Sequence, residues 1–156
     1  MTVEENVAFA FRRDRSLTEG EIERKVAEVL EMVDLPGTED KNPSELSGGM
    51  RKRVGLARAI IYQPQIVLYD EPTTGLDPIV SDSIDHLILR VRDRLDVTTV
   101  VVTHDMRSAR RVGQRILMLH QSKIYVTGTS EEIFQSVDPV VRQFIDCVSD
   151  AKEPHF

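Results

Sequence analysis

Two short apolar runs, each followed at once by polar or charged residues, constrain the fold of this 156-residue chain more than any other feature. "IVLY" at 66–69 leads into Asp70 and Glu71, and "TTVVV" at 98–102 leads into "THD". Both runs have the length and composition of fully buried strands. The segment between them starts at Pro78, which suits the first turn of a helix. A strand, a helix and a second strand predict an α/β fold with a mostly parallel sheet.

The first 46 residues contain no convincing strand and are expected to form a helical annex to that sheet. Thr18 and Glu21 have the spacing of a capping box, which predicts the start of a helix that ends at Pro36-Gly37. Apolar residues recur along this helix at helical spacing: Ile22, Val26, Val29, Leu30 and Val33. Ahead of it, a looser apolar face predicts a short helix or irregular lead-in: Val3, Val7, Ala8 and Phe11.

The rest of the chain alternates further helices with two more strands. A helix is expected over about 50–62, and Asp77 is expected to cap the one that carries Ile84, Leu87, Ile88, Val91 and Leu95. "RILMLH" and "KIYVTG" predict strands joined by a tight turn at Gln121-Ser122. Ser130 is expected to cap the next helix, and 138–148 to form the last one. The tail at 149–156 is expected to be loose.

The composition excludes several classes of protein. With 40% hydrophobic and 29% charged residues, the chain has an ordinary globular composition rather than a disordered one. The net charge of −6 argues against a nucleic-acid partner. No apolar run reaches the ~18 residues of a membrane helix, and the first residues do not form a signal peptide, so a cytosolic location is expected. The single Cys147 excludes an internal disulfide and is expected to be a core thiol.

The paired carboxylates after the first strand are candidates for chemistry. Open α/β sheets bind ligands at the carboxyl ends of their strands, where Asp70 and Glu71 are expected to lie. Asp70 could help to hold Mg²⁺ through water, because hard cations prefer oxygen ligands. Glu71 could orient or deprotonate an attacking water molecule. An exposed acidic turn without function is the alternative, and the strand alone does not decide between them.

Three further candidates could bind phosphate. Ser47, Gly48 and Gly49 precede a helix, where the backbone can approach an anion at the positive end of the helix dipole. A simple serine cap and flexible turn would have the same sequence. His104 follows the second strand and could contact a terminal phosphate, although a structural histidine is the alternative. The basic run at 51–53 is expected to be a solvated helix face rather than an anion site.

The order of these motifs resembles that of the ATP-binding subunits of ABC transporters. "LSGGM" is similar to the signature motif, "IVLYDE" to the Walker B strand, "GLDP" to the D-loop and "TH" to the switch-histidine loop. The resemblance covers essentially the whole chain. It implies a helical subdomain at 1–46, a signature helix and catalytic core at 47–128, and C-terminal helices with a tail at 129–156.

The resemblance also implies a role for each candidate residue and a set of partners. Ser47, Gly48 and Gly49 would bind the γ-phosphate of ATP held by a second ATP-binding subunit. Asp70 would serve Mg²⁺, Glu71 would be the general base, His104 would contact the γ-phosphate, and Asp77 would connect the two sites of the dimer. The region 1–46 would contact a transmembrane permease, which places the subunit on the inner face of the membrane. Met50 replaces the more frequent glutamine, and "LSGGMRKRVGLARAI" with "DPVVRQFID" is similar to lipid-trafficking and organic-solvent-tolerance importer ATPases.

One part of the family pattern is missing from these residues. No Gly-Lys dipeptide occurs, so the phosphate-binding Walker A loop is absent, as is the Q-loop glutamine. Both are expected upstream of Met1, so we expect an N-terminally truncated domain that does not hydrolyse ATP efficiently alone. The strand at 98–102 should then have an unpaired edge. A non-catalytic interaction module derived from an ABC ATPase is the main alternative. A DNA-repair or chromosome-structure ATPase is disfavoured, because no sustained heptad is present.

Overall fold

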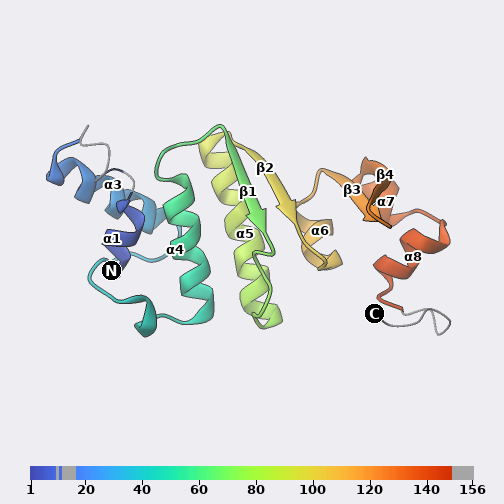
Figure 1. Ribbon diagram of the computed structural model, residues 1–156, viewed down its shortest axis with the longest axis horizontal. Helices are drawn as coiled ribbons and strands as arrows, with labels where there is room; N and C mark the ends of the chain where they lie inside the picture. The colour runs from blue at the N-terminus through green and yellow to red at the C-terminus, as the bar shows by residue number, and fades with distance from the viewer. Residues whose placement is uncertain (10, 12–16, 149–156) are drawn as a thin grey trace. The chain divides into compact units, whose positions relative to one another are not determined.

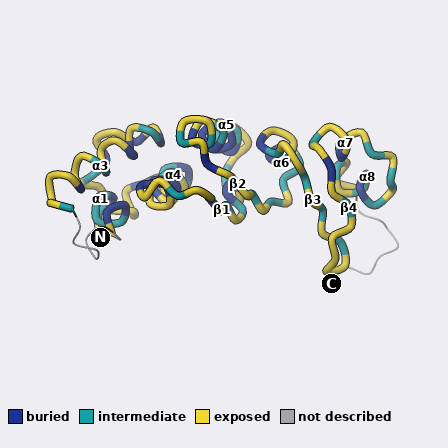
Figure 2. Tube along the Cα trace, turned by 90° about the horizontal axis from the view of Figure 1, so that it is seen from above, coloured by how far each residue is buried: buried dark blue, intermediate teal, exposed yellow. Residues whose placement is uncertain are grey.

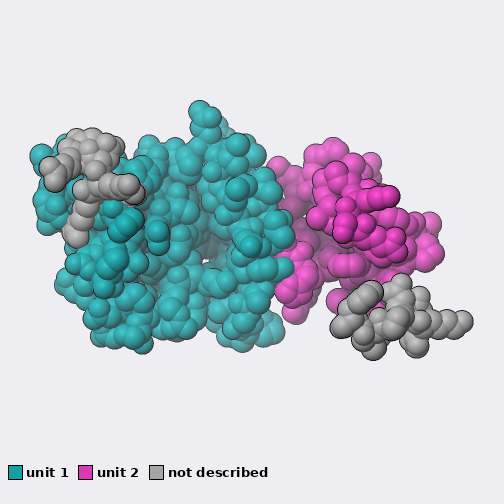
Figure 3. All heavy atoms as spheres, in the orientation of Figure 1, with its two compact units in different colours: residues 1–102 teal, residues 103–156 magenta. Residues whose placement is uncertain are grey.

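The computed structural model describes residues 1–9, 11 and 17–148, in two compact units. Figure 3 colours the two units separately, with the first spanning Met1–Val102 and the second Thr103–Phe156. The predicted loose tail at 149–156 lies outside the described residues. None of the described helices is both long and apolar enough to cross a membrane.

The first unit begins with the helices α1 (Val3–Val7) and α3 (Glu19–Met32), which Figure 1 shows in blue. The predicted apolar face of the lead-in is buried, and Val3 and Val7 are almost inaccessible to solvent. At the start of α3, the carboxylate of Glu21 accepts hydrogen bonds from the N–H and the hydroxyl of Thr18, at 2.8 and 2.7 Å. The helix ends before Asp34, which has a left-handed φ of 58°.

Capping boxes recur at the starts of helices in the described part of the chain. In each, a carboxylate accepts the backbone N–H of the cap residue three positions earlier. These backbone hydrogen bonds hold the pKa of Glu21, Glu45 and Glu132 below the ordinary value. The pairs are Thr2 with Glu5, Thr18 with Glu21, Asn42 with Glu45 at the short 3₁₀ helix Pro43–Glu45, and Thr129 with Glu132.

The core of the first unit is packed mainly between helices. The predicted helix at about 50–62 is α4 (Gly48–Ile60), and the crossover helix is α5 (Pro78–Leu95). Leu30 of α3, Ile60 of α4 and Leu87 of α5 are essentially inaccessible to solvent and belong to one apolar cluster. Burying side chains of this size stabilises the fold by about 1.5–3 kcal/mol each. The helical periodicity therefore predicted the buried faces correctly.

The strands β1 (Ile66–Asp70) and β2 (Thr98–Val102) pair in parallel, with Leu68 opposite Val100. The predicted strand–helix–strand unit is thus present, and the α/β fold class is confirmed. The prediction that both strands are fully buried is wrong. Val67 is 3% exposed and joins the core, but Leu68 and Val102 are 74% and 57% exposed. Figure 2 shows α5 on one side of the two strands, so the opposite face keeps its apolar side chains in contact with solvent. Within the described residues β2 pairs only with β1, as expected for an open edge.

The second unit contains α6 (Met106–Val112), β3 (Arg115–His120), β4 (Lys123–Thr129), α7 (Ser130–Phe134) and α8 (Pro139–Ile145). The two strands form an antiparallel hairpin. Its loop residues Gln121 and Ser122 have φ values of 49° and 59°, which is the geometry of a type I′ turn. The predicted tight turn is therefore confirmed.

Two predictions for this unit are wrong. Thr129, not Ser130, caps α7: its hydroxyl accepts the N–H of Glu132, whose carboxylate accepts the N–H of Thr129 in return. Ser130 lacks this partner, because an isoleucine lies three residues after it. Cys147 is exposed rather than part of the core. Because α8 ends at Ile145, Cys147 no longer follows its buried face, and its φ is 52°.

Candidate functional site

The Ser-Gly-Gly turn forms the beginning of α4. Ser47 is the N-cap residue, and its exposed hydroxyl accepts the N–H of Met50 at 3.2 Å. Both glycines pack closely against the segment that leads into α5 and its first turn. A Cβ atom on Gly49 would lie 2.7 Å from Cγ1 of Val80, and one on Gly48 would lie 3.3 Å from Cδ2 of Leu76. The turn therefore combines a helix cap with a close approach of two helices.

The two candidate carboxylates lie at the end of β1. Asp70 is the last residue of the strand, pairs with Val102 in the register and is exposed. Within the described residues its carboxylate oxygens make no hydrogen bond or ion pair that would compete with a cation. Two free carboxylate oxygens at the carboxyl end of a strand fit the preference of Mg²⁺ for carboxylate and water ligands. Asp70 thus suits the predicted metal role, which stays a prediction.

Glu71 is held in an unusual backbone conformation. Its φ of 48° lies in the left-handed region, which non-glycine residues rarely adopt. Its N–H donates to the carbonyl of Val102 at 2.9 Å, and its own carbonyl accepts a hydrogen bond from Nζ of Lys52 at 3.0 Å. Its carboxylate accepts the hydroxyl of Thr74 at 2.7 Å. These contacts fix both the backbone and the carboxylate of the predicted general base.

The loop after Glu71 leads into the cap of α5. Gly75 has a φ of 80°, which favours glycine at this position. One oxygen of Asp77 accepts the N–H groups of Ile79 and Val80, each at 3.0 Å, and Asp77 is otherwise exposed. The predicted cap is therefore confirmed. The further role implied for Asp77, a connection between two sites of a dimer, is still a prediction.

The basic run that follows the glycines is not simply a solvated face. Arg51 donates to the carbonyl of Leu46 at 2.5 Å, and Lys52 reaches Glu71. The side chain of Arg53 is only 15% exposed and contacts residues of α5 and of the end of α3. The expectation of a solvated face is thus wrong for Arg53. No local pattern indicates this burial, because the partners of Arg53 lie 19 to 30 residues away in the chain.

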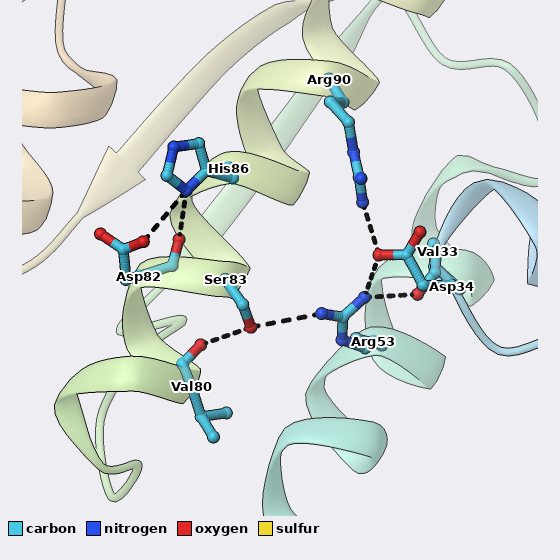
Figure 4. A network of polar contacts seen from close by, with 8 residues as sticks. All are labelled: Val33, Asp34, Arg53, Val80, Asp82, Ser83, His86 and Arg90. Atoms are coloured by element: carbon cyan, nitrogen blue, oxygen red, sulfur yellow. Dashed lines mark hydrogen bonds and ion pairs between the residues drawn. The ribbon is translucent and has the colours of Figure 1, made fainter.

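Asp34 is the acidic centre of this polar network, which Figure 4 shows in detail. One of its carboxylate oxygens accepts hydrogen bonds from both Arg53 and Arg90, each at 2.5 Å. Partial burial raises the pKa of Asp34, but the hydrogen bonds and charges of the two arginines outweigh it, so the pKa is lower than usual.

His104 belongs to the second unit and lies between β2 and α6, where it is exposed. The next residue, Asp105, caps α6 by accepting the N–H groups of Arg107 and Ser108. The first unit thus contains Ser47, Gly48, Gly49, Asp70, Glu71 and Asp77, and the second contains His104. The proposed contact of His104 with a phosphate is still a prediction.

Comparison with known proteins identifies relatives along almost the whole chain. Residues 1–74 match the ABC transporter family. The chain is 42% identical to the probable ribonucleotide transport ATP-binding protein mkl of Mycobacterium leprae, over 94% of this chain and 42% of that protein. It is 36% identical to the methionine import ATP-binding protein MetN 1 of Bacillus cereus, over 99% of this chain and 44% of that protein. The chain therefore spans less than half the length of these curated relatives.

Solved structures of ATP-binding proteins of ABC type share the fold of this chain. CbiO1 from Clostridium perfringens, part of an ABC transporter complex, superposes with a TM-score of 0.78 at 28% identity, covering 85% of this chain and 53% of that one. A dimeric ATP-binding cassette in a post-hydrolysis state, bound to ADP and phosphate, has a TM-score of 0.71 at 32% identity, covering 83% and 57% of the two chains. Residues 1–74 are therefore similar to an ABC transporter domain, and the chain has the fold of the corresponding part of these P-loop NTPases.

Proposed function

We propose that this chain is part of the subunit that binds and hydrolyses ATP in an ABC transporter and couples hydrolysis to transport across a membrane. The observation that carries the proposal is the meeting of three elements at the beginning of α4. The Ser-Gly-Gly turn packs against the start of α5, and Lys52 of the same helix holds Glu71 at the end of β1. The closeness of these three segments, which carry three of the four motifs that resemble the family, supports the proposal.

The proposed roles follow from this arrangement and from the family resemblance. The exposed hydroxyl of Ser47 and the backbone of Gly48 and Gly49 bind the γ-phosphate of a nucleotide held by a second ATP-binding subunit. Asp70 helps to hold Mg²⁺, which neutralises charge on the phosphates when it is bound. Glu71, fixed by Lys52 and Thr74, orients the attacking water and accepts its proton. His104 contacts the γ-phosphate.

The proposed partners are a transmembrane permease and a second ATP-binding subunit. The permease binds the helical region 1–46, which holds the subunit at the inner face of the membrane. The relatives are named for ribonucleotide, methionine and sulfate or thiosulfate transport. The similarity of the signature segment to lipid-trafficking ATPases adds lipid to these candidate substrates.

We further propose that the chain alone is inactive, because none of its 156 residues supplies a Gly-Lys phosphate loop. Isothermal titration with Mg-ATP tests this, with Asp70→Asn as the control. We expect no binding up to millimolar ATP. Tight binding that is lost in the control would contradict the proposed inactivity. Hydrolysis by the chain alone that disappears in Glu71→Gln would contradict it as well, and would exclude the alternative of a non-catalytic module.

The proposed ATPase role itself is tested by complementation. A full-length relative, the 42% identical mycobacterial protein, is prepared with the residue aligned to Ser47 replaced by arginine, so that a dimer of two such subunits would lack a working signature. Adding this chain should restore ATP hydrolysis, because Ser47 then completes the site on the relative's nucleotide. The Ser47→Arg chain should restore none. Failure of the unchanged chain to restore hydrolysis would overturn the proposal.

A further inference from the structure

Arg53 links its own helix to two other elements of the first unit through one guanidinium group. Its Nη1 donates to the carbonyl of Val33 at 2.8 Å and to Asp34 at 2.5 Å, both just past the end of α3. Its Nη2 donates to Oγ of Ser83 on α5 at 3.2 Å. Since Arg53 itself is on α4, its side chain joins α3, α4 and α5, as Figure 4 shows. The planar fork of arginine suits such a contact, and lysine could not make it.

These contacts lie one helical turn from the Ser-Gly-Gly turn. Gly49 and Arg53 are four residues apart, so they share one face of α4, and Val80 and Ser83 share one face of α5. Gly49 is packed against Val80, and the hydroxyl of Ser83 donates to the carbonyl of Val80 at 2.8 Å. Arg53 therefore holds α4 and α5 together one helical turn beyond the point where the Ser-Gly-Gly turn contacts α5.

Arg90 provides an internal comparison. It donates to the same oxygen of Asp34 at the same distance of 2.5 Å. Its side chain is 57% exposed, however, against 15% for Arg53. Arg90 lies on α5 and has no contact with α4 among the described hydrogen bonds. The two arginines thus share an acceptor but differ in whether they link α4 to α5.

From this difference we propose that Arg53 is a positioning residue for the phosphate-binding turn. By holding α4 against α5, its guanidinium fixes Ser47 and Gly49 relative to the capped start of α5. Because Arg53 also holds the end of α3, a displacement of the helical region 1–46 is passed to the turn through the same side chain. The catalytic part of this inference rests on the proposed function, whereas the structural part does not.

Hydrogen exchange of the chain alone tests the structural part. The amide of Met50, which donates to Ser47, reports whether the turn is held. We expect it to exchange about tenfold faster in Arg53→Met, where opening costs less, and at nearly the original rate in Arg90→Met. An unchanged rate in Arg53→Met, or an equal increase in both variants, would overturn the inference. If Arg53→Met does not fold, Ser83→Ala removes the link from Arg53 to α5, together with the hydrogen bond of the hydroxyl to Val80, and should speed the same amide.

The complementation assay with the signature-disabled relative tests the catalytic part. At saturating ATP, Arg53→Met should lower the maximal restored rate about tenfold without changing the concentration of chain that gives half of it. Arg90→Met should change neither, and Arg53→Lys should restore only part of the rate. If only the half-saturating concentration of the chain changed, Arg53 would act in the binding of the chain to the relative. That result would overturn the positioning role. If the unchanged chain restores no activity, the proposed function fails, and hydrogen exchange alone decides on Arg53.

Discussion

The ammonium group of Lys52 lies 3.0 Å from the carbonyl oxygen of Glu71, so the helix that begins at the Ser-Gly-Gly turn holds the residue that follows β1. Glu71 needs such support, because a left-handed φ costs a residue with a side chain about 1 kcal/mol. We expect Lys52→Met, which keeps the length of the side chain, to lower the free energy of unfolding by about 0.5–1 kcal/mol. Urea denaturation followed by circular dichroism measures the change.

Lys123→Met is the matched control for Lys52, because it makes the same chemical change at the start of β4 in the other unit. Its unfolding midpoint should stay close to that of the unchanged chain. Equal midpoints for the two variants would mean that the hydrogen bond to Glu71 contributes nothing to stability.

The glycines of α4 should respond in opposite directions to alanine. Gly49→Ala places a Cβ 2.7 Å from Val80 and should destabilise the fold by about 1–3 kcal/mol. Gly55→Ala, on the same helix, meets nothing within 4 Å and should stabilise it by up to about 1 kcal/mol. Thermal unfolding compares the two. Val80→Ala should relieve the strain of Gly49→Ala, and a Gly49→Ala protein as stable as the Gly55→Ala protein would contradict the packing argument.

Asp34 should make stability depend on pH in the acid range. Its pKa is lower in the folded chain than in the unfolded one, so the unfolded state binds the proton more tightly. Its contribution is fully present above the unfolded pKa and is lost as the pH falls through that value toward the folded pKa. We expect the urea midpoint to fall between about pH 5 and pH 3, and to fall less steeply in Asp34→Asn. Asp40→Asn, an exposed site nearby, should keep the steeper slope.

Local patterns predicted the elements of this fold well, and contacts between distant segments poorly. The helical spacing of Ile84, Leu87 and Val91 is a property of neighbouring residues, and their burial was predicted correctly. The placement of Arg53 depends on residues on two other helices, which no local pattern reveals. Likewise, an apolar strand has the same sequence pattern whether one face or both faces of its sheet are covered. The exposure of Leu68 could therefore not be predicted.

The exposed face of β1 and β2 should promote self-association. Ile66, Leu68, Val100 and Val102 are between 47% and 74% exposed, and an apolar face beside an open strand edge favours pairing with another chain. We expect Leu68→Thr combined with Val102→Thr to reduce light scattering at high concentration while leaving the unfolding midpoint nearly unchanged. Ile124→Thr, an equally exposed site on the hairpin, is the control. Equal scattering by all three proteins would exclude this face as the cause.

Part of the chain's negative charge comes from the glutamates of the capping boxes at its helix starts. Their four glutamates each accept the N–H of a cap residue, and glutamine offers the same acceptor without charge. Replacing all four by glutamine would change the net charge from −6 to −2, because four negative charges are removed. Isoelectric focusing should then show a higher isoelectric point, with the helical content unchanged in circular dichroism, and a loss of helix would contradict this. The low isoelectric point of the chain therefore results in part from the residues that cap its helices.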